Sequence, residues 1–167
     1  MSDLAAALQV AIRTHADQRD KQGAPYLLHV LRVVEAVSDE AKVVAALHDV
    51  LEDGELNLEE LEGEADLGPD EVLAIAYLTR IPDESYTAYI EQIGRDYAPG
   101  EIPRRPSAPR LLAREVKLAD LRDNLSRMPE TPNPGEGEDG WLTPTRPEWA
   151  SLKARYEKAI ETLEAKE

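Results

Sequence analysis

The sequence predicts an all-α fold of about seven or eight helices. Of its 167 residues 42% are hydrophobic, yet there is no Phe and only 5% of the residues are aromatic. The core must therefore be built mainly from Leu, Ala, Val and Ile, a composition that favours close-packed helices over a sheet. Apolar residues recur at helical spacing along the chain, and no segment has the alternating pattern of a strand.

Eight segments carry the helical pattern, and several have a clear start or stop signal. Ser2 or Asp3 can cap the first helix, and Gly54 is placed to end the third. Asn57 and Ser85 can cap two further helices. The expected helices span 3–18, 26–38 and 39–53, a short acidic segment after Asn57, a segment from Pro69 to about residue 80, and then 85–95, 110–127 and 148–165.

A single domain accounts for the whole of residues 1–167, because a chain of this length fits one compact unit. Residues 129–147 hold most of the remaining Pro and Gly and cannot form regular structure. This segment is either a flexible lid or an ordinary surface loop. The helix expected at 148–165 follows it and has an apolar stripe with which to pack against the rest.

The charge balance excludes several classes of partner. The 34 acidic and 19 basic residues give a net charge of −15, which repels phosphate backbones and argues against a nucleic-acid polymer as partner. The absence of Cys excludes thiolate catalysis and cysteine-bound zinc. No apolar run approaches the roughly 20 residues of a membrane span. The sequence therefore predicts a soluble cytoplasmic protein with no membrane partner, and it leaves open whether the protein is a monomer or a homo-oligomer.

The stretch HDVLED, residues 48–53, concentrates one imidazole and three carboxylates in a helix-forming run. At about 100° per residue, His48, Asp49, Glu52 and Asp53 share one arc of a helix, apart from the apolar stripe. The ordinary interpretation is a solvated acidic face. However, no Lys or Arg balances this arc, and the preceding VVAAL predicts burial nearly all round. Buried carboxylates without a basic partner need a metal ion or a proton.

Two residues elsewhere in the chain can complete a metal site. His29 lies among apolar residues of the second expected helix, and Asp120 lies beside the apolar stripe of the helix expected at 110–127. Each alone is more typical of a core histidine and a surface aspartate. Together with His48 and Asp49 they form a mixed nitrogen and oxygen set suited to Mn²⁺, Fe²⁺ or Zn²⁺.

The order His29, His48-Asp49, Asp120 resembles the pattern of the HD-domain metal-dependent phosphohydrolases. Longer stretches resemble the (p)ppGpp hydrolase domain of Rel/SpoT enzymes and the small alarmone hydrolases. These stretches are HADQRDKQGAPYLLH at 15–29, AALHDVLED at 45–53, LTR at 78–80 and VKLADLRDN at 116–124. They span most of residues 15–125, and the resemblance implies the compact helical HD-domain fold.

The resemblance also implies a chemistry for these residues. It implies one divalent ion, Mn²⁺ in that family, with Fe or Zn as alternatives, and it gives the metal four ligands. Glu52 and Asp53 are implied to position and activate the water that attacks phosphorus, cleaving a phosphate ester or pyrophosphate of a small-molecule nucleotide. The implied metal ligands are His29, His48, Asp49 and Asp120.

Three residues are expected to contact the substrate. Lys21 and Asn124 match contacts of the family. Arg80 is a weaker match, included because a cation near the site could hold a phosphate.

Asp20 departs from the family pattern, in which Arg usually precedes the Lys now at position 21. Because that Arg helps to hold the nucleotide, Asp20 favours an alternative: a mononucleotide or other nucleotide phosphatase with little (p)ppGpp activity. A second alternative is a non-catalytic HD-fold module that senses a nucleotide or a metal. The Glu52-Asp53 pair weighs against it, since a sensor does not need to activate water.

Overall fold

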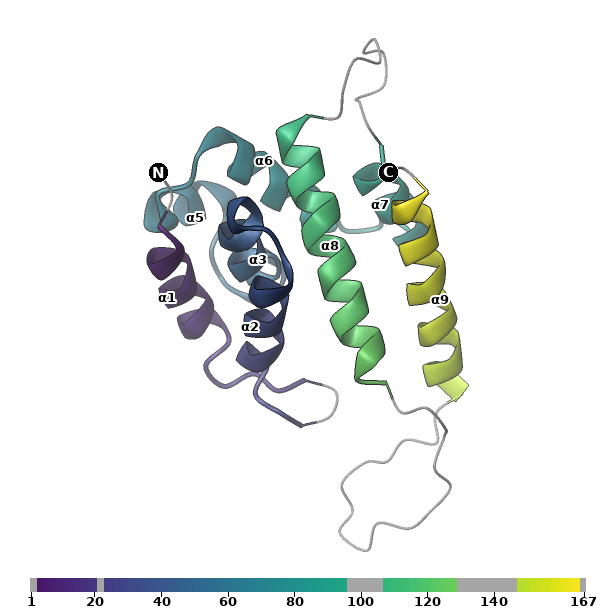
Figure 1. Cartoon of the computed structure of the whole chain (residues 1–167). Helices are drawn as coiled ribbons and strands as arrows, with labels where there is room; N and C mark the ends of the chain where they lie inside the picture. The colour runs from purple at the N-terminus through teal and green to yellow at the C-terminus, as the bar shows by residue number, and fades with distance from the viewer. Residues whose placement is uncertain (1–2, 21–22, 96–106, 129–146, 166–167) are drawn as a thin grey trace, which may run out of the picture.

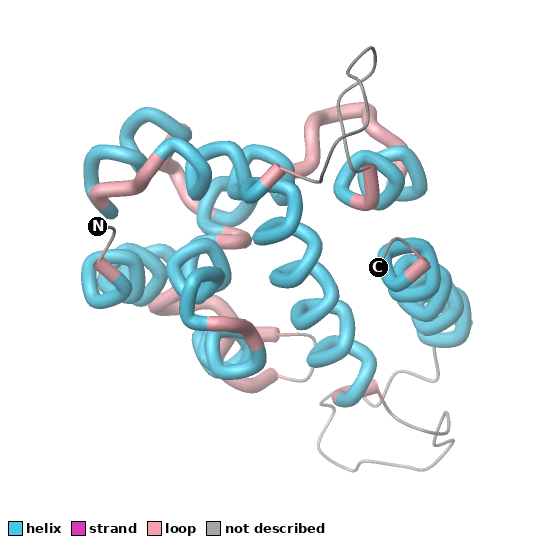
Figure 2. The backbone as a smooth tube through the Cα atoms, turned by 45° about the horizontal axis from the view of Figure 1, so that its top comes forward, coloured by secondary structure: helices cyan, strands magenta, loops and turns pink. Residues whose placement is uncertain are grey.

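The computed structural model describes residues 3–20, 23–95, 107–128 and 147–165 (Figure 1). These ranges contain nine α-helices and one 3-10 helix, and their one β-type pairing is an isolated bridge between Arg19 and Pro25 (Figure 2). The all-α prediction is confirmed. The helices are α1 Leu4–Thr14, α2 Leu27–Ala36, η1 Asp39–Ala41, α3 Lys42–Leu47, α4 Val50–Asp53, α5 Leu58–Ala65, α6 Pro69–Leu78, α7 Tyr86–Ile93, α8 Ala108–Ser126 and α9 Pro147–Glu164.

Local capping explains why several helices begin where the sequence predicts. The Asp3 side chain accepts a hydrogen bond from the Ala5 amide, and Ser85 does the same for the amide of Ala88. Asn57 and Glu60 form a reciprocal capping box at the start of α5. These contacts satisfy amides that have no partner within the helix.

The prediction of one continuous helix over residues 39–53 is wrong. The segment begins as the 3-10 helix η1, continues as α3, and is interrupted at His48 and Asp49 before α4 starts. Asp49 has φ −114° and ψ 1°, which is outside the regular helical region. Because the backbone leaves helical geometry at Asp49, a single helical wheel does not describe how His48 is related to Glu52 and Asp53. The extra break also explains why the helices outnumber the seven or eight expected.

Helix α3 is the central element of the fold. All five residues of VVAAL, Val43–Leu47, are buried, as the sequence predicts. The helix packs against α1, α2, α6 and α8, so its C-terminal end delivers His48 to the interior. Because an apolar helix that is buried on every side cannot shift without opening a cavity, this placement is well fixed.

The long helix α8 runs through the middle of the molecule, between α2 on one side and α9 on the other (Figures 1 and 2). Helix α9 packs on α8 and α7 and buries Ala159 and Leu163. Residues 129–146, nearly all of the segment considered as a lid, lie outside the described residues. None of the described helices combines the length and apolar character that a membrane span requires.

Candidate metal and active site

Three side chains from three helices converge at the centre of the fold. His29 comes from α2, His48 follows α3, and Asp120 comes from α8; one potential ligand atom of each lies within 4.8 Å of the others. All three residues are buried. The packing of α2, α3 and α8 therefore brings together residues that are far apart in sequence.

The two imidazoles are oriented in the same way. Nδ1 of His48 lies 2.8 Å from the carbonyl oxygen of Ala45, and Nδ1 of His29 lies 2.7 Å from Oδ2 of Asp123. Both contacts hold Nδ1 as the donor, so in the neutral imidazole the lone pair is on Nε2.

Each Nε2 atom is buried and makes no hydrogen bond of good geometry, although Asp49 Oδ2 lies 3.0 Å from that of His48 and Asp120 Oδ1 lies 3.2 Å from that of His29. Burial opposes protonation of His48, but Asp49 and Asp120 raise its pKa to about 9, so a metal ion at Nε2 would replace a proton there. Two buried imidazole nitrogens that face carboxylate oxygens form a donor set that fits a divalent metal ion.

Asp49 lies at the edge of this group. Its Oδ2 is 3.0 Å from Nε2 of His48 and accepts a hydrogen bond from the Tyr26 hydroxyl. Burial opposes ionisation of Asp49, but the neighbouring His48 outweighs it and lowers the pKa of the carboxyl to about 2. Burial and the same carboxylate raise the pKa of Tyr26 far above its usual range. Tyr26 therefore stays protonated and donates to an ionised Asp49.

Asp120 is surrounded by donors. Its Oδ2 lies 2.7 Å from Nζ of Lys117, and its Oδ1 accepts from Nδ2 of Asn124 at 2.6 Å. Burial would raise the pKa of Asp120, but Lys117 and the two imidazoles hold it well below its usual range. Lys117, 13% exposed, lies over the Tyr89 ring at 5.3 Å. The sequence prediction did not include Lys117, although its position three residues before Asp120 on a helix was a usable signal.

The two acids that follow the HD pair are held separately on α4. Oε1 of Glu52 accepts from the Arg80 amide at 2.7 Å, and partial burial of the carboxyl group raises the pKa of Glu52. Oδ2 of Asp53 accepts from Nε2 of Gln18 at 2.8 Å. Gln18 in turn contacts Nδ1 of His15, a buried histidine that the sequence prediction did not assign to the site.

Comparison with known proteins tests the resemblance to the Rel/SpoT enzymes. No family model matches the chain. A GTP pyrophosphokinase of Streptomyces coelicolor is 32% identical in a 129-residue alignment that covers 73% of this chain and 14% of that protein. A solved structure, described as a metazoan ortholog of SpoT that hydrolyzes ppGpp, aligns over 98% of this chain and 92% of its own with 25% identity and a TM-score of 0.62. The resemblance to the Rel/SpoT hydrolases is confirmed.

The candidate centre adjoins a pocket of about 340 Å³. Asp49, Asp53, Lys117, Asp120 and Asn124 line it on the side of the converging groups. The residue Met128, just after α8, and helix α9 supply an apolar and aromatic part of the lining, formed by Met128, Trp149, Leu152 and Tyr156. The pocket thus joins the candidate metal centre to a surface suited to a small organic ligand.

Of the three residues expected to contact the substrate, Asn124 lines this pocket and Arg80 is not among its lining residues. Asn124 lines the pocket but already donates to Asp120. Arg80 is exposed, and its guanidinium donates twice to the Glu84 carbonyl, at 3.0 and 2.6 Å. Lys21 lies outside the described residues. Asp20, the departure from the family pattern, lines the pocket and pairs with Arg127 at 2.5 Å.

Proposed function

We propose that this protein is a metal-dependent phosphohydrolase of the small alarmone hydrolase type, which cleaves a phosphate ester or pyrophosphate of a nucleotide. The observation that carries the proposal is the convergence of the buried residues His29, His48 and Asp120, which each place one potential ligand atom within 4.8 Å of the others. The two Nε2 atoms make no hydrogen bond of good geometry and face carboxylate oxygens at 3.0 and 3.2 Å. A buried polar atom without a partner is costly unless something else satisfies it. The similarity to a structure described as a ppGpp hydrolase supports a metal ion as the missing partner and phosphate hydrolysis as its use.

His29, His48 and Asp120, with Asp49 beside them, are the residues that would hold the ion. Two imidazoles and two carboxylates suit Mn²⁺, and Fe or Zn are the alternatives. When bound, such an ion supplies a Lewis acid that lowers the pKa of water and polarises a phosphate oxygen. The Tyr26 hydroxyl donates to Asp49 and orients its carboxylate, which His48 keeps ionised despite its burial.

Glu52 and Asp53 are proposed to position the attacking water and to accept its proton. The raised pKa of Glu52 makes its carboxylate a better proton acceptor than an ordinary surface glutamate. The Arg80 amide holds one oxygen of Glu52, which leaves the other to accept the proton. Asp53 lines the pocket, and Gln18 fixes its orientation.

The rest of the pocket is proposed to hold the nucleotide. Trp149 and Tyr156 offer aromatic faces for a base. Arg127, which also pairs with Asp20, is a cation for phosphate oxygens. Asn124 would have to release Asp120 to donate to the substrate. Lys21 remains a proposed substrate contact from the sequence.

A second candidate is a mononucleotide or other nucleotide phosphatase with little (p)ppGpp activity. Four aspartates line the pocket, namely Asp20, Asp49, Asp53 and Asp120. Such a concentration of negative charge disfavours a substrate with many phosphates unless the ion and nearby cations offset it. The two candidates share the same centre and differ in substrate.

A substrate screen with added Mn²⁺ tests the proposal. Phosphate and pyrophosphate release is measured for (p)ppGpp, NADPH and nucleoside mono-, di- and triphosphates. We expect turnover of at least one, its loss in Asp49→Ala and a severe reduction in Glu52→Ala. A Mn²⁺-loaded protein that turns over none of them contradicts the proposal, and tight nucleotide binding without turnover would favour a sensing module. A preparation for which (p)ppGpp is by far the best substrate excludes the second candidate.

A further inference from the structure

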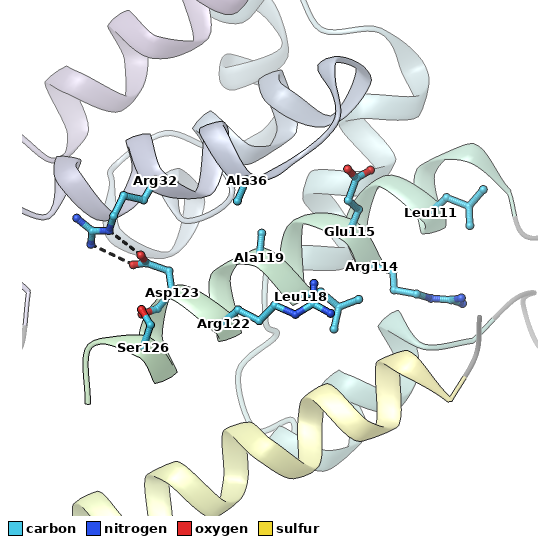
Figure 3. Close-up of a pocket in the computed structure, with 10 residues that line it drawn as sticks. All are labelled: Arg32, Ala36, Leu111, Arg114, Glu115, Leu118, Ala119, Arg122, Asp123 and Ser126. Carbon is cyan, nitrogen blue, oxygen red and sulfur yellow. Dashed lines mark hydrogen bonds and ion pairs between the residues drawn. The ribbon is translucent and has the colours of Figure 1, made fainter. Parts of the chain in front are cut away.

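An ion pair between α2 and α8 continues into the candidate metal centre. Arg32 on α2 donates to Asp123 on α8 through Nε at 2.6 Å and Nη2 at 3.0 Å (Figure 3). Oδ2 of the same carboxylate lies 2.7 Å from Nδ1 of His29, one turn before Arg32 on α2. Asp123 therefore bridges a guanidinium and one of the two converging imidazoles.

The surroundings of this bridge favour a well-defined geometry. The Asp123 side chain is 11% exposed and that of His29 is 3% exposed. Arg32 and Asp123 lie at one end of a pocket of about 880 Å³ that runs along α2 and α8 (Figure 3). Glu115 and Arg122 also line this pocket. The planar fork of Arg32 meets both carboxylate oxygens, which fixes the plane of the carboxylate as well as its position.

The bridge determines how His29 presents its second nitrogen. A carboxylate that accepts from Nδ1–H keeps the proton on that nitrogen and the lone pair on Nε2. Nε2 is the atom that lies 3.2 Å from Asp120 Oδ1. His48 obtains the same orientation from a neutral backbone carbonyl, that of Ala45, so only His29 has a charged partner on Nδ1.

We propose that Asp123, held in place by Arg32, is a positioning residue that fixes the tautomer and ring orientation of His29 for metal binding. This inference rests on the proposed function, because it assigns His29 to the metal. A carboxylate behind a ligating histidine orients the ring and increases its strength as a ligand. The competing role is purely structural: the ion pair would join α2 to α8 without affecting the metal.

Matched variants of the full chain separate these roles. Asp123→Asn keeps the shape of the side chain and removes its charge. Glu115→Gln is the control: it removes a charge from the same helix and pocket, where Glu115 binds the amide and hydroxyl of Ser38 at 2.6 and 3.0 Å. Arg32→Ala is paired with Arg122→Ala, which removes a cation from the same pocket and breaks an exposed ion pair to Glu164 of α9.

Two measurements are made on each variant. Calorimetric titration with Mn²⁺ alone gives the metal affinity, and the visible absorption of the Co²⁺-loaded protein reports the geometry of the ligands. We expect Asp123→Asn to weaken Mn²⁺ binding by about 10- to 100-fold and to change the Co²⁺ spectrum. Arg32→Ala should cause a smaller loss of affinity, and both controls should match the wild type.

The outcomes separate this inference from the proposed function. If Asp123→Asn binds Mn²⁺ as the wild type does, with the same Co²⁺ spectrum, the positioning role is overturned even though turnover continues. If the variants behave as expected but no substrate is turned over, the positioning role stands and the phosphohydrolase proposal fails. If Asp123→Asn does not fold, the Mn²⁺ affinities of Arg32→Ala and Arg122→Ala are compared, since Arg32→Ala leaves the carboxylate in place. Equal affinities of these two variants would overturn the positioning role. Wild type that binds neither ion overturns both.

Discussion

The hydroxyl of Tyr26 donates a hydrogen bond to Oδ2 of Asp49, and this contact links the start of α2 to the break between α3 and α4. Asp49 also lies 3.0 Å from Nε2 of His48 through the same oxygen. The phenol thus constrains a carboxylate that belongs to the candidate metal centre.

Replacing Tyr26 by Phe removes this donor and keeps the ring. Because a hydrogen bond to a charged group contributes about 1.5–3 kcal/mol, we expect kcat to fall by about 10-fold or more. Steady-state kinetics with the best substrate of the screen checks this. Tyr89→Phe is the control, since its hydroxyl donates to the Leu78 carbonyl at 2.5 Å. It should lower stability by about 1–3 kcal/mol with little change in kcat. Wild-type kcat in Tyr26→Phe would show that the contact is not used.

The sequence could predict those features that depend on local contacts. Asp3, Asn57 and Ser85 begin helices as expected because a cap needs only amides two or three residues away. The burial of Val43–Leu47 follows from composition alone, because a segment with no polar residue has no face to turn toward solvent.

Other features could not be predicted because they arise from packing between helices. A helical wheel assumes regular geometry, whereas Asp49 leaves the helix so that its carboxylate can meet His48 and Tyr26. The link from Asp123 to His29 needs α2 beside α8, which periodicity does not specify. Hydrophobic patterns indicate which face of a helix is buried, but not which helix it meets.

Gly54, directly after HDVLED, occupies a position with no room for a side chain. An added Cβ would lie 2.6 Å from the Val50 carbonyl oxygen and 3.0 Å from Cγ2 of Thr14. We expect Gly54→Ala to destabilise the protein by about 1–3 kcal/mol, because the backbone of α4 must shift. Since α4 carries Glu52 and Asp53, kcat should also fall by about 10-fold or more.

Gly63 in α5 is the matched control for this substitution. An added Cβ there meets nothing within 4 Å. Gly63→Ala should therefore stabilise the protein by about 0.5–1 kcal/mol, because Ala favours the helix over Gly. Chemical denaturation measures both free energies of unfolding. Equal effects of the two substitutions would contradict the close packing at Gly54.

The ion pair of Lys117 and Asp120 should be replaceable in part by a metal ion. Lys117→Met removes the ammonium 2.7 Å from Asp120 and leaves a buried carboxylate without its main cation. We expect the metal-free protein to lose about 3–5 kcal/mol of stability. Mn²⁺ should raise the melting temperature of Lys117→Met more than that of the wild type, because the ion supplies positive charge to the same carboxylate.

Lys42→Met serves as the control, since Lys42 makes an exposed pair with Asp39 at 2.5 Å. Surface pairs of this kind contribute about 0–1 kcal/mol, so its stability and its response to Mn²⁺ should match the wild type. A Lys117→Met protein whose melting temperature rises with Mn²⁺ only as much as the wild type would show that the ion does not reach Asp120.

The backbone amide of Arg80 donates a hydrogen bond to Glu52, so variants of the two side chains can test separately a catalytic role of Glu52 and a substrate-binding role of Arg80. Because the Arg80 amide, not its guanidinium, holds Glu52, Arg80→Ala leaves this hydrogen bond intact. The guanidinium is engaged with the Glu84 carbonyl. We therefore expect Arg80→Ala to change KM and kcat little, while Glu52→Gln, which preserves shape but cannot take a proton, lowers kcat by about 100-fold or more. Steady-state kinetics of both variants checks this pair of expectations. A rise in KM with unchanged kcat in Arg80→Ala would instead place the guanidinium on the substrate, and wild-type kcat in Glu52→Gln would remove Glu52 from the proton transfer.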